Sequence, residues 1–174
     1  MLPGKLNFIQ NCWVVPDLEA AMERWVGMGV GPFFRRDSNY PEAIYRGTPV
    51  PLSFRGAIAQ AGSVQIELIQ QTSSGPSAYR DTFAEGESGF HHMLHFTDHF
   101  AEDVQALRAR GIEMASEFSS LGGASVVYAD TREEIGCMLE LLPPVPILLK
   151  AFRMVADAAS NWDGRDPVRM LNFD

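Results

Sequence analysis

The chain has 174 residues, enough for one domain with a sizeable core or for two small modules that share one. Hydrophobic residues make up 46% and charged residues 21%, which is ordinary for a globular protein, and the net charge of -8 disfavours nucleic acid and anionic lipid as partners. The sequence shows no signal-peptide pattern and no apolar run long enough to cross a membrane, so we expect a cytoplasmic protein with two buried, reduced cysteines.

Apolar periodicity predicts two similar runs of elements. The first run predicts a strand over residues 5–15, a helix over 18–27 capped by Asp17, and strands from 31 to 70, of which 52–60 and 63–70 are the clearest. The second run predicts a strand over 90–97, a helix over 100–110, a strand after 112, and two more over 125–130 and 137–142. A helix follows over 145–159, and residues 161–174 lack clear periodicity.

This order predicts four segments. The first module spans residues 1–71, and a polar, turn-rich linker with a short helix spans 72–88. The second module spans 89–144, and the C-terminal helix and tail span 145–174.

The two runs are consistent with an internal duplication. An offset of 82 residues places Gln10 on His92 and Gly29 on Gly111, and apolar positions of the two helices coincide. The final strands also match, because IELIQ and LELLP each carry one glutamate among apolar residues. The duplication therefore pairs Gln10 with His92 and residue 67 with residue 140.

Strand alternation then brings four polar groups to one cavity. Gln10, Glu67, His92 and Glu140 fall on corresponding faces of the first and last strands of the two modules. Two inward carboxylates repel each other unless they are protonated or bridged by a cation, and a divalent ion with one imidazole and one amide ligand resolves the conflict. This donor mixture suits Zn²⁺, Ni²⁺, Co²⁺ or Mn²⁺ without selecting among them. The alternative is that either glutamate lies on a solvated sheet face or pairs with an arginine.

The remaining histidines have ordinary expected roles. Alternation along the strand places His91 and His95 on the face opposite His92; we expect His91 to be structural or to support the ligand, and His95 to be packed or hydrogen-bonded there. His99 occupies the place that Asp17 has in the first run, so we expect it to cap a helix or to be exposed.

Several stretches resemble a known family, the vicinal oxygen chelate superfamily. They are IQNCWVVPDLEAAMERW, VQIELIQ, GFHHMLHFTDHF and GCMLELLP, and the resemblance covers about residues 5–145. It implies an α+β fold in which two βαβββ modules form a curved, incompletely closed mixed sheet around a central cavity, followed here by the C-terminal helix. The family's metal ligands come from the first and last strands of each module and fall on Gln10, Glu67, His92 and Glu140.

The superfamily includes glyoxalase I, methylmalonyl-CoA epimerase, bleomycin-resistance proteins and extradiol dioxygenases. The ligand set of this chain is similar to that of some glyoxalase I enzymes, whereas the epimerases usually carry histidine in the place of Gln10. Extradiol dioxygenases need two histidines and one glutamate, so Gln10 disfavours that chemistry.

The resemblance implies a divalent-metal-dependent isomerase, epimerase or lyase. Such an enzyme moves a proton next to a carbonyl through a metal-bound enediolate, and the substrate is a small molecule such as a thioester or hemithioacetal. Glu140 is the first candidate for the catalytic base and Glu67 the second. The alternative is a protein of the bleomycin-resistance type, which sequesters a small molecule and needs no catalytic metal.

Two further expectations concern partners. Arg35, Arg36, Arg46, Arg55 and Arg80 could meet an anionic part of a substrate, although surface solubility explains them equally well. The exposed edges and apolar rim of an incompletely closed sheet predict a homodimer, with the apolar run 145–149 either in the dimer contact or closing the cavity.

Overall fold

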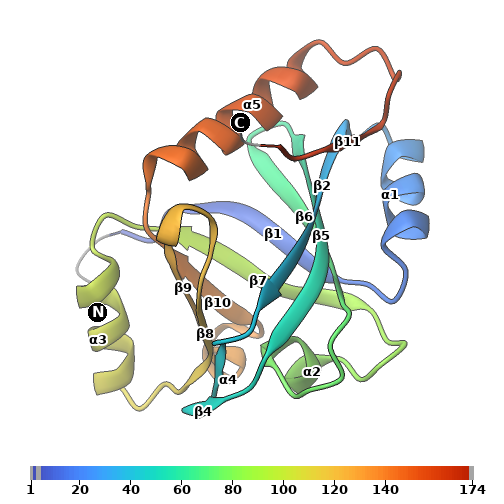
Figure 1. Ribbon diagram of the computed structural model, residues 1–174. Helices are drawn as coiled ribbons and strands as arrows, with labels where there is room; N and C mark the ends of the chain where they lie inside the picture. The colour runs from blue at the N-terminus through green and yellow to red at the C-terminus, as the bar shows by residue number, and fades with distance from the viewer. Residues whose placement is uncertain (1, 3–4, 173–174) are drawn as a thin grey trace.

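The computed structural model describes residues 2 and 5–172 of the chain. Within them, one mixed sheet of 11 strands runs in the order β11-β2-β5-β6-β1-β7-β10-β9-β8-β3-β4. The sheet is curved and does not close, and the helices Leu18–Gly27 and Phe100–Ala109 cover its outer face (Figure 1). The expected α+β architecture is confirmed.

The strands are β1 Phe8–Val14, β2 Phe33–Tyr40, β3 Ile44–Tyr45, β4 Thr48–Pro49, β5 Leu52–Ala61, β6 Val64–Gln71, β7 Gly89–Phe96, β8 Met114–Ser119, β9 Ser125–Ala129, β10 Met138–Leu142 and β11 Val168–Met170. The helices are α1 Leu18–Gly27, α2 Ala78–Thr82, α3 Phe100–Ala109, the short 3-10 turn η1 Leu121–Gly123, α4 Arg132–Ile135 and α5 Pro146–Ser160.

The centre of the sheet is the antiparallel pair of β1 and β7. Each of these strands also has a parallel neighbour, β6 for β1 and β10 for β7. The four strands that carry the predicted site residues are therefore adjacent, in the order β6-β1-β7-β10. The division of the chain into two modules stays a prediction.

The ends of α1 show how local sequence sets the elements. The Asp17 carboxylate accepts a hydrogen bond from the Ala20 amide at 3.0 Å, so this residue caps the helix as its sequence predicts. The helix ends at a turn in which Gly29 has a φ of 88°, a conformation that glycine adopts without strain. Leu18, Ala21 and Met22 are buried against β5 and β6, which fixes the helix on the outer face of the sheet.

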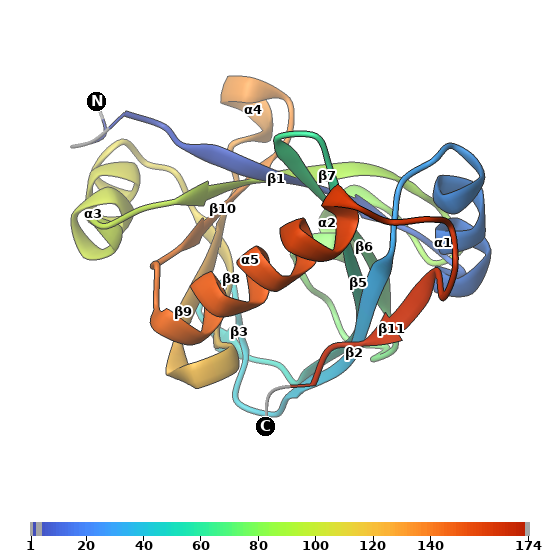
Figure 2. The same ribbon diagram turned by 90° about the horizontal axis from the view of Figure 1, so that it is seen from above.

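Helix α5 lies across the open, concave side of the curved sheet (Figure 2). Val155 is fully buried and packs with Phe34 of β2 and Ile58 of β5. None of the helices in the described part of the chain is both long and apolar enough to span a membrane.

The tail holds one element that periodicity does not predict. After α5 the chain turns back, and residues 168–170 form β11 in parallel with Phe33, Phe34 and Arg35 of β2. A strand of three residues is too short to show a period of two, and main-chain hydrogen bonds to an existing edge supply its order.

Candidate metal and active site

The register of the central strands has an internal symmetry. Gln10 of β1 lies opposite Leu94 of β7, and Cys12 lies opposite His92. The parallel neighbours repeat this relation, because Cys12 pairs with Glu67 just as Leu94 pairs with Glu140. The offset that relates the two halves in sequence thus matches the hydrogen-bonded register.

A β-bulge precedes each of the two central site positions. The β1–β7 register shifts between Phe8 and Gln10 and again between Cys12 and Trp13, which leaves Ile9 and His91 as the extra residues. A bulge re-aims the neighbouring side chains and interrupts strict alternation. The expectation that His91 points away from His92 is therefore wrong: their Nδ1 atoms lie 2.8 Å apart.

The predicted site residues meet on one side of the sheet. His92 Nε2 lies 3.0 Å from Glu140 Oε2 and 3.4 Å from Glu67 Oε2. His92 is fully buried, and the two glutamates are 9% and 7% exposed. Gln10, Glu67 and Glu140 line the same cavity. In the part of the chain that the structure describes, neither glutamate lies on a solvated face or pairs with an arginine, which removes the alternative that the sequence left open.

These buried atoms fit a bound cation. Glu67 Oε2, His92 Nε2 and Glu140 Oε2 are buried without a hydrogen-bond partner among the described residues other than one another. Buried polar atoms that lack other partners are costly, and a bound cation would satisfy all three of them at once. Two carboxylates would neutralise a divalent ion, while imidazole and amide donors add no charge.

The partner of His92 determines which of its nitrogens is free. His91 Nε2 lies 2.9 Å from the Ala78 carbonyl oxygen, which only accepts, so this nitrogen carries the proton. Burial, and then the neighbouring imidazole, lower the pKa of His91 to about 3, so the ring is neutral and its Nδ1 is an acceptor. His92 Nδ1 must therefore donate, which leaves Nε2 as the atom offered to a cation.

Protonation of His92 shows how strongly this place attracts positive charge. Burial by itself lowers the pKa of an imidazole, but the carboxylates of Glu140 and Glu67 outweigh it and raise the pKa of His92 to about 9. Burial also raises the pKa of Glu140, although the neighbouring His92 opposes this. A metal ion would take the place of the Nε2 proton.

Gln65 and Cys12 contact the predicted ligands. Gln10 donates a hydrogen bond from Nε2 to Gln65 Oε1 at 2.5 Å. This contact orients the Gln10 amide and leaves the Gln10 side-chain oxygen available to bind a metal ion. Cys12 Sγ lies within 4.8 Å of donor atoms of Glu67 and His92. Burial, followed by the nearby glutamates, raises the pKa of the Cys12 thiol, so it is a neutral neighbour of the carboxylates.

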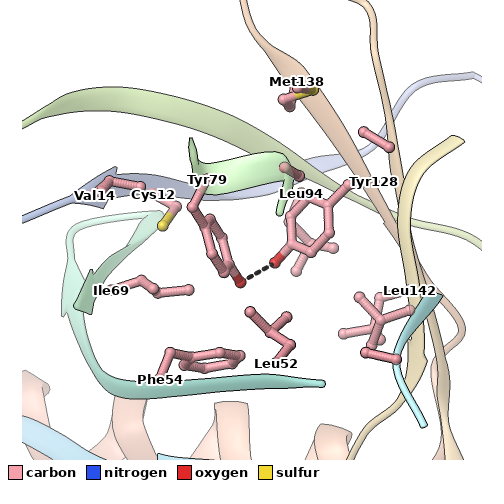
Figure 3. Packing of buried hydrophobic residues seen from close by; sticks show 14 of the residues in the cluster. Cys12, Val14, Leu52, Phe54, Ile69, Tyr79, Leu94, Tyr128, Met138 and Leu142 are labelled. Carbon is pink, nitrogen blue, oxygen red and sulfur yellow. Dashed lines mark hydrogen bonds between the residues drawn. The ribbon is translucent and has the colours of Figure 1, made fainter. Parts of the chain in front are cut away.

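Two buried tyrosines pack against each other beside the site (Figure 3). The hydroxyls of Tyr79 and Tyr128 lie 3.1 Å apart, and both side chains are buried. Tyr128 lines the cavity and lies opposite Glu140 in the β9–β10 ladder. Sequence reasoning missed both tyrosines and Gln65. Only Gln65 had a visible signal, because it shares a strand face with Glu67.

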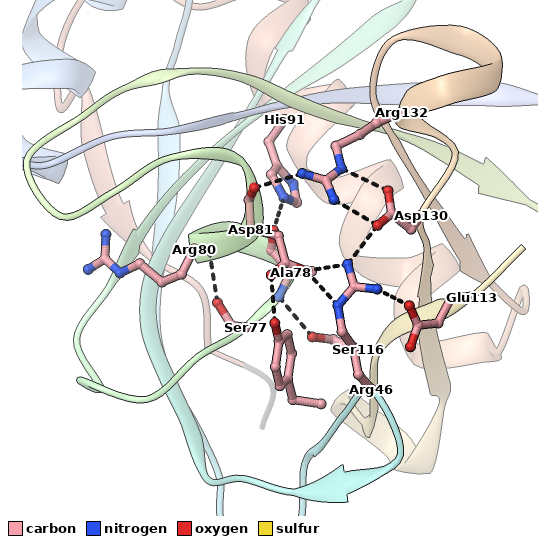
Figure 4. A network of polar contacts seen from close by, with 11 residues as sticks. Arg46, Ser77, Ala78, Arg80, Asp81, His91, Glu113, Ser116, Asp130 and Arg132 are labelled. Carbon is pink, nitrogen blue, oxygen red and sulfur yellow. Dashed lines mark hydrogen bonds and ion pairs between the residues drawn. The ribbon is translucent and has the colours of Figure 1, made fainter.

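An ionic cluster supports α2, the helix that presents Ala78 to His91 (Figure 4). Arg46 binds Asp81 of α2 at 2.7 Å and Asp130 at 2.6 Å, and it also pairs with Glu113. Arg132 pairs with Asp130 and donates to the Asp81 carbonyl. These contacts join α2 to the β3–β4 turn and to the end of β9.

The cavity is small and partly apolar. Its volume is about 50 Å³, several times the minimum that one water needs, so it has room for an ion and a small polar molecule. Leu148, Ala151 and Phe152 of α5 line it together with Leu171 of the tail. Of the two roles expected for the apolar start of this helix, the structure shows that it closes the cavity.

The other histidines lie outside the site. His95 is buried, accepts from the Asn7 amide at 3.1 Å and faces Asp103 at 3.3 Å, as a packed and hydrogen-bonded residue. His99 is exposed at the start of α3, and its side chain makes no capping hydrogen bond.

Comparison with known proteins agrees with this fold. The family model described as the Glyoxalase/Bleomycin resistance protein/Dioxygenase superfamily matches residues 9–128. A search among curated proteins finds no match. Among solved structures, methylmalonyl-CoA epimerase from Mycobacterium tuberculosis superimposes with a TM-score of 0.58 at 16% identity, covering 87% of this chain and 97% of its own.

Two further structures show the same fold. A hypothetical protein from Bacillus halodurans C-125 gives a TM-score of 0.57 at 19% identity, over 82% of this chain and 96% of its own. A Streptomyces coelicolor methylmalonyl-CoA epimerase in complex with 2-nitronate-propionyl-CoA gives 0.56 at 17% identity, over 84% and 98%. The family model covers well over half of the sequence, and the chain belongs to the glyoxalase/bleomycin resistance protein/dioxygenase superfamily.

Proposed function

We propose that this protein is a metal-dependent isomerase or epimerase that transfers a proton at a carbon next to a carbonyl group. The observation that carries the proposal is the buried meeting of His92 Nε2 with Glu67 Oε2 and Glu140 Oε2, which have no hydrogen-bond partner among the described residues apart from one another. Structures of methylmalonyl-CoA epimerases share the fold, which supports chemistry of this class.

Gln10, Glu67, His92 and Glu140 would hold the divalent ion. When bound, the ion would supply a Lewis acid that polarises the substrate carbonyl. His91 holds the imidazole of His92 in the tautomer that offers Nε2. Gln65 holds the amide of Gln10.

Glu140 is our first choice for the base, and Glu67 is the second. A general base works best when its pKa approaches the working pH, and burial raises the pKa of Glu140. Its carboxylate takes the proton from the carbon beside the carbonyl. Protonation of the same carbon on its opposite face gives an epimer, and protonation of the neighbouring carbon gives an isomer. The lining by Phe54, Phe118 and Leu142 keeps bulk water away from the reacting carbon.

Metal content tests the binding half of the proposal. We expect about one equivalent of divalent metal in protein purified without chelator, and loss of most of it in His92→Ala. The matched control is His99→Ala, because His99 is exposed and distant from the carboxylates. Equal metal content in the two variants would contradict the ligand assignment.

Proton exchange tests the catalytic half. Metal-replete protein in D₂O should exchange the α-proton of at least one member of a panel of hemithioacetals, acyl thioesters, α-hydroxy ketones and small 2-oxo acids, followed by NMR. Glu140→Gln should slow exchange by about 10² to 10⁴-fold, whereas the exposed control Glu133→Gln should not. Protein that binds ligands but exchanges none of them would favour sequestration, the non-catalytic alternative within the superfamily.

A further inference from the structure

The structure separates the arginines that the sequence offers as anion-binding candidates. Most of them are occupied by acidic partners or lie away from the cavity. Arg35 and Arg55 share Glu19, and Arg46 belongs to the ionic cluster around Asp81 and Asp130. Three of the five are thereby assigned to structural ion pairs.

Arg36 differs from these neighbours. It follows Arg35 on β2, so its side chain lies on the opposite, concave face, where it lines the cavity of the candidate active site. Within residues 2 and 5–172, its guanidinium has neither an ion pair nor a hydrogen bond. It lies opposite Gly56 of β5, which has no side chain to compete for that space.

The charge of the cavity then depends on Arg36. The charged residues that line it are Arg36, Glu67 and Glu140. A divalent cation offsets the two carboxylates, which leaves the guanidinium as the uncompensated charge. An unpaired guanidinium in a partly apolar cavity is a strong binding group for carboxylate or phosphate oxygens, because its fork of donors matches them.

The size of the cavity limits the size of the molecule that carries this anionic group. The volume is about 50 Å³, far below the roughly 300–1,000 Å³ of pockets that enclose drug-sized ligands. Leu148, Ala151 and Phe152 of α5 form part of the cavity wall. A nucleotide-bearing thioester cannot be enclosed here, whereas a compound of a few carbons is compatible with the space.

We propose that the substrate is a small organic anion whose carboxylate or phosphate pairs with Arg36 while its carbonyl faces the cluster of Glu67, His92 and Glu140. This assignment of a substrate class rests on the proposed function. It makes Arg36 the residue that selects charged substrates over neutral ones.

Equilibrium binding to the zinc-loaded protein tests the proposal separately from turnover. The carboxylate probe is 2-oxobutyrate and its neutral control is methyl 2-oxobutyrate. The phosphate probe is dihydroxyacetone phosphate with dihydroxyacetone as control. Calorimetry should show one acidic probe bound at least about 10-fold more tightly than its neutral partner, and the pair that does so identifies the anion.

Arg36→Gln should weaken binding of that acid by about 10- to 100-fold, to the level of its neutral partner, while Arg36→Lys keeps part of the preference. Arg35→Gln, on the opposite face of the same strand, should bind the acid as the unaltered protein does. Zinc content and thermal unfolding should be unchanged in Arg36→Gln, which separates this test from failure of the metal site.

Three results would overturn the proposal. The first is equal binding of acid and neutral partner in both pairs, including no binding of either. The second is an Arg36→Gln protein that retains full preference for the acid. The third is propionyl-CoA binding as tightly as the small acids. The proposed function fails independently, through absence of metal or of α-proton exchange.

Discussion

Replacement of His91 by leucine tests whether this residue positions the metal ligand beside it. In the structure His91 accepts the Nδ1 proton of His92 at 2.8 Å and donates to the Ala78 carbonyl at 2.9 Å, and both imidazoles are fully buried. His91→Leu leaves the ring of His92 free to change tautomer and rotate. Loss of such a partner typically weakens metal binding by about 10- to 100-fold, or about 1.4–2.8 kcal/mol.

The same replacement should also cost stability. It leaves the His92 Nδ1 proton and the Ala78 carbonyl without partners, at about 1–3 kcal/mol each, so we expect a loss of about 2–6 kcal/mol in the free energy of unfolding of the metal-free protein. His91→Asn is the second variant, because its amide oxygen restores an acceptor near Nδ1. It should recover much of the metal affinity even where stability stays low.

The assay is zinc affinity by competition with a chelator, alongside urea unfolding. His95→Asn is the matched control: His95 is equally buried on the same strand but contacts Asn7 and Asp103 instead of the site. It should lose stability without losing zinc affinity. A folded His91→Leu protein that binds zinc as tightly as the unaltered chain would refute the positioning role, and so would an equal loss of affinity in the control.

Two further predictions concern stability and assembly. Asp130→Asn should lower the free energy of unfolding by about 1–3 kcal/mol at pH 7, because Asp130 pairs with Arg132 and Arg46. Asp163→Asn is the control: Asp163 pairs with Arg165 on the exposed surface, so its replacement should change stability little. Arg132, then Arg46, hold the pKa of Asp130 well below its usual range, so its contribution to unfolding free energy is present above about pH 4 and is lost as the pH falls. Chemical unfolding at pH 7 and pH 3 checks the sign. We also predict a homodimer, and a monomeric mass by light scattering at micromolar concentration would contradict it.

Local chemistry in the sequence predicts much of the structure because those signals act over short distances. Asp17 caps α1, and the helix runs over the predicted residues. Strand parity and the repeat offset bring Glu67, His92 and Glu140 to one place, since a period of two leaves each side chain only two faces. A charged residue inside an apolar strand was the informative signal, because burial of an unpaired carboxylate is costly.

What the sequence did not predict depends on contacts between distant segments. The bulge at His91 arises from the pairing of β7 with β1, and nothing in GFHHMLHF marks it. Helix α5 was expected, but its place over the cavity depends on Val155 packing with residues of β2 and β5. Strand β11 is ordered by the edge that it joins.

The central place of β1 has a consequence for synthesis of the chain. β1 is made before both of its hydrogen-bonding partners, β6 and β7, and His92 follows its neighbour Cys12 by 80 residues. At about 5–20 residues per second, translation leaves this apolar strand without its second neighbour for roughly 4–16 s. The centre of the sheet is therefore completed only after β7 has been made, and pairings between segments so far apart in the chain form slowly.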